Sequence, residues 1–433
     1  MKKVLIISPY FPPVNAADMQ RVRMSLPYFA DFGWDAEVVC VNPQFVDMAK
    51  DELLTESVPA GIKTHYVNAF SKSLTAKFGL GSIALRSLWF YRKEVNRLLK
   101  AQQFDLIYFS TTQFPICILG VYWKKRFDIP YVIDMQDPWH SDYYRDKPKY
   151  QRPPKYWFSY RLNKLLEPKA MKSVGGLISV SEDYITTLKQ RYPEITAVPA
   201  STITFGAFAP DLKIAADNRQ RFQSLLDSES KNIVYVGRGG NDMHKAITPL
   251  FAALKEGLAN SPEVFGNLKL YFIGTSYAPA GLGTQTIIPL AKQYGVEQYV
   301  TELTDRISYY HTLLTLQQAD ALFIPGSDDP KYTASKIFPY LLTQKPLLAI
   351  FNKNSSAIGI LQEFGAEHVY DYENVEQSAL IDFMKQVATG NMATPTYNTA
   401  AEEKYSAKHM TSAQCQLFDK VLSGHSTAKN VPA

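Results

Sequence analysis

The stretch from Asn232 to Lys245 constrains the fold more than any other part of this 433-residue chain. It begins with an apolar run, Ile233 to Val236, that has the length and composition of a buried strand. The run breaks at Gly237-Arg238-Gly239-Gly240, and a helical pattern follows over about residues 246–258. This order is typical of half a nucleotide-binding unit. It also occurs as an ordinary strand–turn–helix joint with two solvated basic residues, and this stretch alone leaves both interpretations open.

The first interpretation would give the turn the chemistry of an anion site. Glycines at 237 and 239 let backbone N–H groups approach a ligand, and the N-terminus of the next helix carries partial positive charge. Arg238 and Lys245 add two full charges, and His244 is a further candidate contact. If the stretch is a nucleotide site, these residues hold its phosphates.

Strands alternate with helices of about 10 to 15 residues through both halves of the chain, which predicts a parallel α/β sheet in each. The expected strands are at residues 4–7, 37–41, 62–68, 105–110, 130–136, 176–181, 233–236, 268–273, 320–324 and 346–350. The expected helices are at residues 19–32, 82–100, 114–126, 182–192, 246–258, 286–294, 309–318, 336–343 and 401–422. The fold class is therefore α/β, with two doubly wound, Rossmann-like domains.

The chain is too long for one hydrophobic core, and 46% apolar and 20% charged residues are ordinary for a globular protein. We expect a first domain at residues 1–208, a second at 209–398, a closing helix at 399–422 and a disordered tail at 423–433. The turn from Phe205 to Phe208 marks the exit from the first domain.

Neither a cleaved leader nor a membrane span is predicted. The apolar run after Lys3 stops at Ile7, and the longest apolar stretch, residues 114–123, is too short to cross a bilayer. The three cysteines lie far apart without metal-ligand spacing, which favours free thiols in a reducing compartment. We expect a cytoplasmic protein, or one held peripherally on the inner face of the plasma membrane.

Two segments follow expected strands of the first half and are therefore candidate site walls. Ligands of parallel α/β sheets bind at the carboxyl ends of strands. The loop Pro9–Asp18 comes after the first strand, and Asp137-Pro-Trp-His140 comes after the strand at 130–136. Asp137 has a structural alternative, because Asp-Pro commonly opens a turn.

In their order and spacing, these pieces resemble the retaining glycosyltransferases of the GT-B fold, specifically family 4 and its close relatives. The segment Asp134–Trp139 resembles the members that build cell-surface polysaccharides. The other similar segments are Ser8–Pro13 with Arg21, Ile178–Glu182, Thr204–Phe208, Gly237–Lys245 and Ser335–Pro346. Each is weakly specific, but together they span nearly the whole chain.

The resemblance implies two domains facing across a cleft, with the closing helix crossing back onto the first. It implies transfer of a hexose, with retention, from a nucleotide sugar to a glycan or lipid-linked acceptor in polysaccharide assembly, with no metal and no cofactor. The donor diphosphate would be held by Gly237, Arg238, Gly239, Lys245, Ser335 and Lys336. The acceptor and the reacting sugar would be faced by Pro13, Asn15, Ala16, Arg21, Gln136, Asp137 and His140.

The sequence departs from this family at the donor site. Many members carry two glutamates there, and the matching positions are Lys331 and Pro339, whose side chains accept no hydrogen bond. Asp328 and Asp329 could replace the first glutamate, and nothing obvious replaces the second.

The acceptor side departs as well. Gln136 stands where relatives often have His or Arg. Because a Gln side chain does not titrate, Asp137 or His140 would have to act as the general base there. A catalytically degenerate GT-B protein acting as a binding or scaffold partner is therefore the alternative, and a sugar-nucleotide epimerase is a third possibility.

Residues 143–172 combine nine Lys or Arg and seven aromatic residues with two acidic ones. This pattern suits the headgroup level of an anionic membrane, which the basic helix expected at 82–100 would extend. A solvated helix with a core-facing aromatic stripe gives the same pattern, and single-stranded nucleic acid ranks behind both. The expected partners are a nucleotide sugar, a glycan or lipid-linked acceptor and an anionic membrane surface through 143–172, and no nucleic acid.

Overall fold

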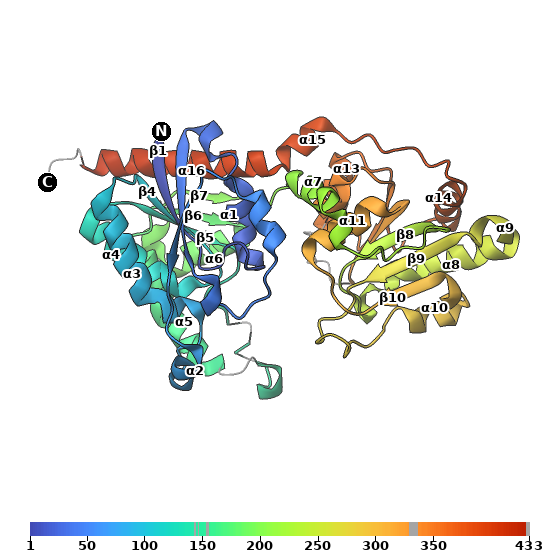
Figure 1. Ribbon diagram of the computed structural model, residues 1–433, viewed down its shortest axis with the longest axis horizontal. Helices are drawn as coiled ribbons and strands as arrows, with labels where there is room; N and C mark the ends of the chain where they lie inside the picture. The colour runs from blue at the N-terminus through green and yellow to red at the C-terminus, as the bar shows by residue number, and fades with distance from the viewer. Residues whose placement is uncertain (143, 146, 153–155, 329–336, 430–433) are drawn as a thin grey trace. The chain divides into compact units, whose positions relative to one another are not determined.

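The chain folds into two compact units (Figure 1). Unit 1 comprises Met1–Gly206 and Tyr405–Ala433, and unit 2 comprises Ala207–Lys404. The computed structural model describes residues 1–142, 144–145, 147–152, 156–328 and 337–429. The chain thus leaves unit 1 within the turn taken as the domain exit, and it returns at Tyr405, after the expected boundary at residue 398.

The described residues of unit 1 form a sheet of seven parallel strands in the order β3-β2-β1-β4-β5-β6-β7. The strands are β1 (Lys2–Ile7), β2 (Trp34–Val41), β3 (Lys63–Val67), β4 (Leu106–Ser110), β5 (Tyr131–Met135), β6 (Gly176–Ser179) and β7 (Ala200–Thr202). The central strands read as continuous apolar runs because helices cover both faces of such a sheet. The strand order reverses between β1 and β4, which pair in register from Val4 with Leu106 to Ile7 with Phe109.

The described helices of unit 1 are α1 (Gln20–Ser25), α2 (Lys72–Thr75), α3 (Ile83–Ala101), α4 (Ile118–Phe127), α5 (Tyr156–Met171), α6 (Glu182–Arg191) and α16 (Ala407–Lys429). Of these, α2 and α5 were not among the expected helices, and α16 begins and ends later than the closing helix expected at 401–422. The expected helix at 19–32 is divided into α1 and a 3-10 turn at Phe29–Phe32. Pro27 lies at the division, where it lacks an N–H and clashes with the preceding turn.

Helix α16 completes the core of unit 1. The Phe418 ring packs against Phe29, Trp34 and Tyr108, with ring centroids 5.0 to 6.3 Å apart. The predicted disorder is corrected for residues 423–429, since α16 remains helical to Lys429, and residues 430–433 of the expected tail lie outside the described residues. His425 holds these last turns, because its Nε2 lies 3.1 Å from the carbonyl oxygen of Asp128.

Unit 2 repeats the architecture, with a parallel sheet in the order β10-β9-β8-β11-β12-β13 over its described residues. The strands are β8 (Lys231–Val236), β9 (Leu268–Ile273), β10 (Val300–Leu303), β11 (Ala321–Pro325), β12 (Leu347–Phe351) and β13 (His368–Asp371). The helices are α7 (Pro210–Asp217), α8 (His244–Asn260), α9 (Pro262–Phe265), α10 (Ile288–Tyr294), α11 (Tyr309–Gln318), α12 (Ile337–Leu342), α13 (Ser356–Glu363), α14 (Gln377–Thr389) and α15 (Thr399–Lys404).

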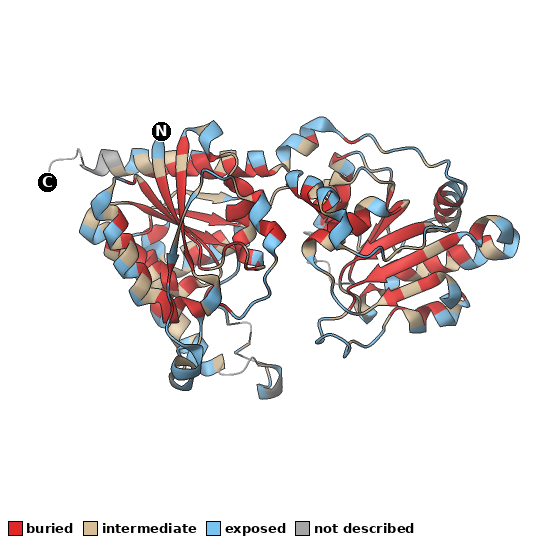
Figure 2. Ribbon diagram, in the orientation of Figure 1, coloured by how far each residue is buried: buried red, intermediate tan, exposed pale blue. Residues whose placement is uncertain are grey.

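Burial follows the two sheets. Figure 2 shows the strands of each unit largely buried, with exposed residues on the outer faces of the helices. The fold class predicted from the sequence, α/β with two Rossmann-like parallel sheets, is confirmed. None of the described helices combines the length and the apolar composition needed to cross a lipid bilayer.

Candidate functional site

In unit 2 the glycine-rich loop lies where the strand order reverses. Strand β8 pairs with β9 on one side and with β11 on the other, so the loops that follow β8 and β11 leave in different directions. Such a reversal creates a crevice at the carboxyl ends of the strands. The two loops meet there, because the backbone N–H of Asp328 donates to the carbonyl oxygen of Asp242 over 2.8 Å.

Asp242 anchors Arg238 at this crevice. The guanidinium donates through Nη2 and Nη1 to the two carboxylate oxygens over 2.5 and 3.1 Å, and Ser327 Oγ donates to the same carboxylate over 2.6 Å. The Arg238 hydrogen bond holds the pKa of Asp242 below its usual range, with Ser327 acting in the same direction against partial burial. A bidentate contact of this kind fixes the orientation of the guanidinium.

Gly239 has the close packing that makes glycine necessary in this loop. Its N–H donates to the carbonyl oxygen of Thr275 over 2.7 Å. A Cβ added at Gly239 would lie 2.9 Å from Thr275 Cβ and 3.1 Å from Thr286 Oγ1. The adjacent Gly240 has a φ of 146°, a conformation that other residues rarely adopt. The loop therefore keeps its shape by packing on the segment that follows β9.

Helix α8 begins directly after this loop, at His244. His244 Nε2 lies 3.0 Å from the carbonyl oxygen of Thr286. Lys245 is exposed, and its ammonium lies 5.8 Å from the ring centroid of Tyr372. Along the chain, Arg238 precedes the start of α8 and Lys245 is the second residue of that helix. Arg238 contacts Asp242, whereas Lys245 lies near the ring of Tyr372.

Part of the expected donor site falls outside the described residues, namely Asp329, Lys331, Ser335 and Lys336. Pro339 lies within α12. The next residue, Tyr340, was not predicted to matter. Its hydroxyl accepts from the N–H of Val236 over 2.8 Å and lies 3.1 Å from that residue's carbonyl oxygen, so it ties α12 to the end of β8.

In unit 1 the loop after β1 and the loop after β4 meet at the corresponding reversal of strand order. Asp18 is buried and accepts hydrogen bonds from Thr111 Oγ1, over 2.9 Å, and from the N–H of Thr112, over 3.0 Å. Burial raises the pKa of Asp18, and the threonine hydrogen bonds oppose the shift. No motif singled out Asp18, although its place after the first strand was a usable signal.

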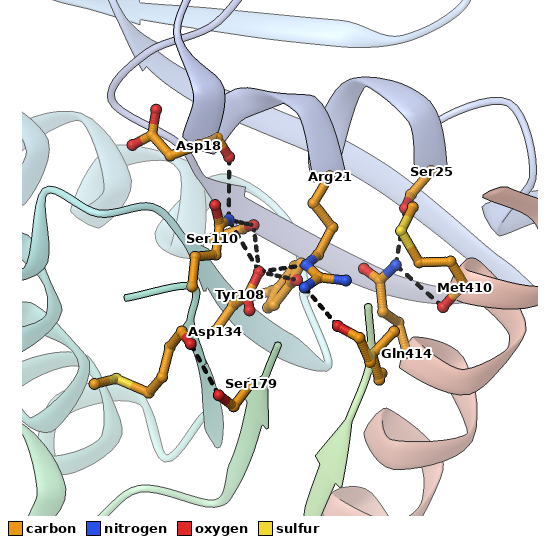
Figure 3. Close-up of polar contacts among 12 residues, drawn as sticks. Asp18, Arg21, Ser25, Tyr108, Ser110, Asp134, Ser179, Met410 and Gln414 are labelled. Atoms are coloured by element: carbon orange, nitrogen blue, oxygen red, sulfur yellow. Dashed lines mark hydrogen bonds and ion pairs between the residues drawn. The ribbon is translucent and has the colours of Figure 1, made fainter. Parts of the chain in front are cut away.

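Arg21 and Gln136 belong to a buried network, and Figure 3 shows its members Arg21, Asp134 and Ser110. Arg21 Nε lies 2.7 Å from Asp134 Oδ2, and neither side chain has solvent-exposed surface. Gln136 Nε2 donates to the same oxygen over 3.0 Å, to Ser110 Oγ over 3.0 Å and to the carbonyl oxygen of Asp18 over 3.1 Å. These contacts correct the expectation that both side chains face the acceptor or the reacting sugar, because they point into the interior of unit 1.

The same arginine fastens the end of β7. Arg21 Nη2 donates to the carbonyl oxygen of Ile203 over 2.7 Å, and the guanidinium lies 4.7 Å from the ring centroid of Phe205. Phe205 stands where the family that the sequence resembles has Asn, and its ring covers the buried charge of Arg21. The exit turn packs tightly against Ser406, the residue next to the point where the chain re-enters unit 1. A Cβ at Gly206 would lie 2.6 Å from the carbonyl oxygen of Ser406.

The rest of the first loop is held by its own backbone. The N–H of Asp51 donates to the carbonyl oxygen of Pro13 over 2.7 Å, and the N–H of Asn15 donates to that of Ala49 over 2.9 Å. Pro13 and Asn15 are half-buried, whereas Ala16 is buried. Among these three, Pro13 and Asn15 keep surface with which to meet a ligand.

Asp137 and the next residue, Pro138, are the exposed members of the segment that follows β5. Partial desolvation by its surroundings raises the pKa of the Asp137 carboxyl, and the charge of Asp18 raises it further. Asp137 lies at a pocket of about 500 Å³. The other lining residues include Thr112, Gln113, Phe114, Trp139, Phe158, Leu162 and Asn163. The Phe114 and Trp139 rings stack with centroids 5.5 Å apart, which gives this pocket an apolar wall beside one carboxylate.

His140 is the last residue of that segment and is buried. Its ring is 4.9 Å from that of Tyr160, and neither ring nitrogen has a hydrogen-bond partner among the described residues. Burial lowers the pKa of His140, and the nearby charge of Arg191 lowers it further. The ring is therefore neutral near pH 7. Its backbone N–H donates to the buried Glu167 over 2.9 Å.

Comparisons with known proteins identify the fold. No protein-family model and no curated protein matches the chain. The α,α-trehalose 6-phosphate synthase from Burkholderia multivorans matches 100% of this chain and 99% of its own, with a TM-score of 0.54 at 12% identity. A mutant of S. aureus TarM, in complex with Fondaparinux, alpha-GlcNAc-glycerol and UDP, matches 97% of this chain and 100% of its own, with a TM-score of 0.54 at 10% identity. These likenesses show the GT-B fold.

Proposed function

We propose that this protein is a retaining GT-B glycosyltransferase, a hexosyltransferase that moves a sugar from a nucleotide-sugar donor to a glycan or lipid-linked acceptor in the assembly of a cell-surface polysaccharide. The observation that carries the proposal is the crevice of unit 2, where Arg238 is fixed by Asp242 beside the start of α8. A fixed guanidinium, a helix N-terminus and a glycine-rich loop together suit a diphosphate.

The chemistry follows from where charge develops. When the bond between the sugar and the diphosphate breaks, the leaving diphosphate gains negative charge. Cations that are already oriented stabilise this charge more in the transition state than in the ground state, which lowers the barrier. In our proposal Arg238 and Lys245 supply these cations, while Gly237 and Gly239 let the backbone approach the phosphates. Ser335 and Lys336 remain proposed contacts to the same group.

On the acceptor side, the proposal assigns contact with substrate to Asp137, together with Pro13 and Asn15. Asp137 is exposed at the pocket that Phe114 and Trp139 also line. The S. aureus TarM structure, which shares this fold, was solved with UDP and alpha-GlcNAc-glycerol, and this is consistent with nucleotide-dependent transfer.

The test is binding and turnover with the full chain. Isothermal titration with UDP, GDP, ADP and TDP identifies the base, and the matching nucleotide sugars are then assayed for hydrolysis and transfer. Arg238→Ala and Lys245→Ala should each weaken nucleoside diphosphate binding by about 10- to 100-fold, because a hydrogen bond to a charged group contributes roughly 1.5–3 kcal/mol. NMR of the product anomer tests retention.

Lys255→Ala is the matched control, since Lys255 is an exposed lysine further along the same helix, α8. It should bind nucleotide like the wild type. Wild-type affinity in the Arg238→Ala, Lys245→Ala double variant would reject the proposed donor site. No nucleotide binding and no turnover in the wild type would favour a catalytically degenerate GT-B protein that binds a partner.

A further inference from the structure

Large hydrophobic side chains are exposed in two segments of unit 1 that lie far apart in the sequence. Among the described residues they are Phe70, Leu74, Leu80 and Trp89 in the first segment and Trp157, Phe158 and Leu165 in the second. Trp89 is 55% exposed and Trp157 is 48% exposed. Exposed apolar groups concentrated in this way mark an interaction site rather than ordinary surface.

The fold brings the two segments together. A Cβ at Gly79 would lie 2.8 Å from the Phe158 ring, so the turn after α2 packs directly on α5. The pocket of about 500 Å³ is lined from both sides, by Gly79 and Leu85 from the first segment and by Phe158 and Leu162 from the second. Figure 1 shows α2 and the start of α5 at the same end of unit 1.

Helical spacing places the exposed residues and several cations on shared faces. On α3, Trp89 and Lys93 follow the pocket residue Leu85 by one and two turns. On α5, Trp157, Arg161 and Lys164 have the spacing of one helix face, and all three are exposed. The Lys93 ammonium lies 5.5 Å from the Trp89 ring centroid, which sets a cation beside an aromatic ring.

Charge separates this region from the rest of the molecule. Residues 70–93 and 143–172 hold 14 Lys and Arg and two acidic residues, which leaves 32 Lys and Arg against 39 Asp and Glu elsewhere. Of the two acidic residues, Asp146 lies outside the described residues, and Glu167 is buried against Arg191. The rest of the chain therefore has a net negative formal charge, whereas these two segments are strongly cationic.

We propose that the exposed side chains of the described segments 70–93 and 156–172 form a surface, called here the basic apolar face, that binds an anionic lipid bilayer. Tryptophans and cations suit the headgroup level, and aliphatic side chains reach the acyl boundary. Leu74 is 66% exposed and Leu165 is 56% exposed, and such side chains offer no ring on which a base could stack. They favour a bilayer over single-stranded nucleic acid.

The pocket beside Asp137 is lined by the same two segments. For the transferase proposed above, an acceptor anchored in the bilayer would present its headgroup there. This consequence rests on the proposed function, whereas the lipid experiment measures binding without donor or acceptor and is independent of it.

The experiment is vesicle flotation of the full chain with phosphatidylcholine alone and with phosphatidylcholine containing 30% phosphatidylglycerol. Binding should require the anionic lipid and fall at high salt. The triple variant Lys77→Gln, Arg161→Gln, Lys164→Gln should reduce the partition coefficient by about a hundredfold, at about fivefold for each cation. The variant Trp89→Phe, Trp157→Phe should abolish most of the blue shift of tryptophan emission on binding.

The matched control neutralises three exposed lysines of unit 2, Lys255, Lys292 and Lys385, by substitution with Gln. It has the same net charge as the test variant and should bind vesicles like the wild type. Circular dichroism confirms that all variants are folded. Equal losses in the two triple variants, equal binding to neutral and anionic vesicles, or binding to oligo-dT but not to vesicles would each overturn the proposal.

Discussion

Arg21 and Asp134 form an ion pair with 2.7 Å between Nε and Oδ2, and both side chains are completely buried. The pair joins α1 to the end of β5, and the other groups of the guanidinium bond to the carbonyl oxygens of Ile203 and Thr204. One side chain therefore ties the first loop, the middle of the sheet and the exit turn together. Arg21 thereby holds these three parts of unit 1 together from within the core.

Removal of one partner from this pair should be strongly destabilising. Arg21→Met leaves the Asp134 carboxylate buried without its countercharge, which costs about 3–5 kcal/mol. Urea unfolding of unit 1, followed by tryptophan fluorescence, measures the change. Lys2→Ala removes an exposed ion pair with Asp419 and should change stability by less than about 1 kcal/mol. Similar losses in the two variants would contradict the assigned importance of the buried pair.

His140 should make stability depend on pH below its ordinary pKa of about 6.5. Burial lowers its pKa in the folded state, so the unfolded chain binds the proton more readily. The contribution of the buried neutral ring to the free energy of unfolding is thus fully present above about pH 6.5, and it is lost as pH falls toward the lowered pKa of the folded state. His140→Phe should remove this loss, whereas the exposed His409→Phe should keep it. Melting temperatures at pH 7.5 and pH 5.0 provide the comparison.

Asp137 should set the acid limb of the pH–activity profile. If the ionised carboxylate contacts substrate, kcat/KM rises with pH through a pKa above the ordinary value of about 3.9. Asp18→Asn removes a neighbouring negative charge and should move this limb to lower pH, while burial, the larger cause, keeps it above the ordinary value. Asp35→Asn, at the amino end of β2, should leave the limb in place. If the acid limb of the kcat/KM profile stays at the same pH in Asp18→Asn, the group that titrates in this limb is not Asp137.

Gly239 should tolerate no side chain. A Cβ there would press on Thr275 and Thr286, so Gly239→Ala should cost about 1–3 kcal/mol or displace the loop, and it should weaken nucleotide binding. Gly359→Ala is the control, because that glycine lies in α13 and a Cβ added there would have open space. It should stabilise the protein by up to about 1 kcal/mol. Thermal unfolding and nucleotide titration of the two variants measure both effects.

The sequence predicted the central buried strands well, because a short continuous apolar run is typical of a parallel strand that is covered on both faces. Strand β13 was missed because all its residues are half-buried and it lacks that pattern. Strand β10 was missed as well, because it is short and Glu302 interrupts its apolar run. That glutamate is buried because the N–H groups of Ile287 and Ile288, at the start of α10, donate to it over 2.9 Å. Tertiary hydrogen bonds of this kind leave no periodic signal.

Site residues were harder to predict because a sequence gives the position of a side chain along a strand or loop and not its direction. Gln136 and Asp137 are adjacent in the chain, yet Gln136 is buried in the core of unit 1 and Asp137 is exposed. Arg21, three residues after Asp18, is buried as well. Asp242 was not among the expected site residues, because the sequence does not show which side chain a loop carboxylate contacts. In the structure it orients the guanidinium of Arg238.

The packing of α16 on the first sheet has a consequence for biosynthesis. Phe418 belongs to the same aromatic cluster as Phe29, Trp34 and Tyr108, which precede it by some 300 residues or more. Ribosomes deliver a chain from its N-terminus, so residues 207–404 emerge and can fold while the earlier sheet still lacks one wall of its core. The half of the protein that is translated first is therefore the half that matures last.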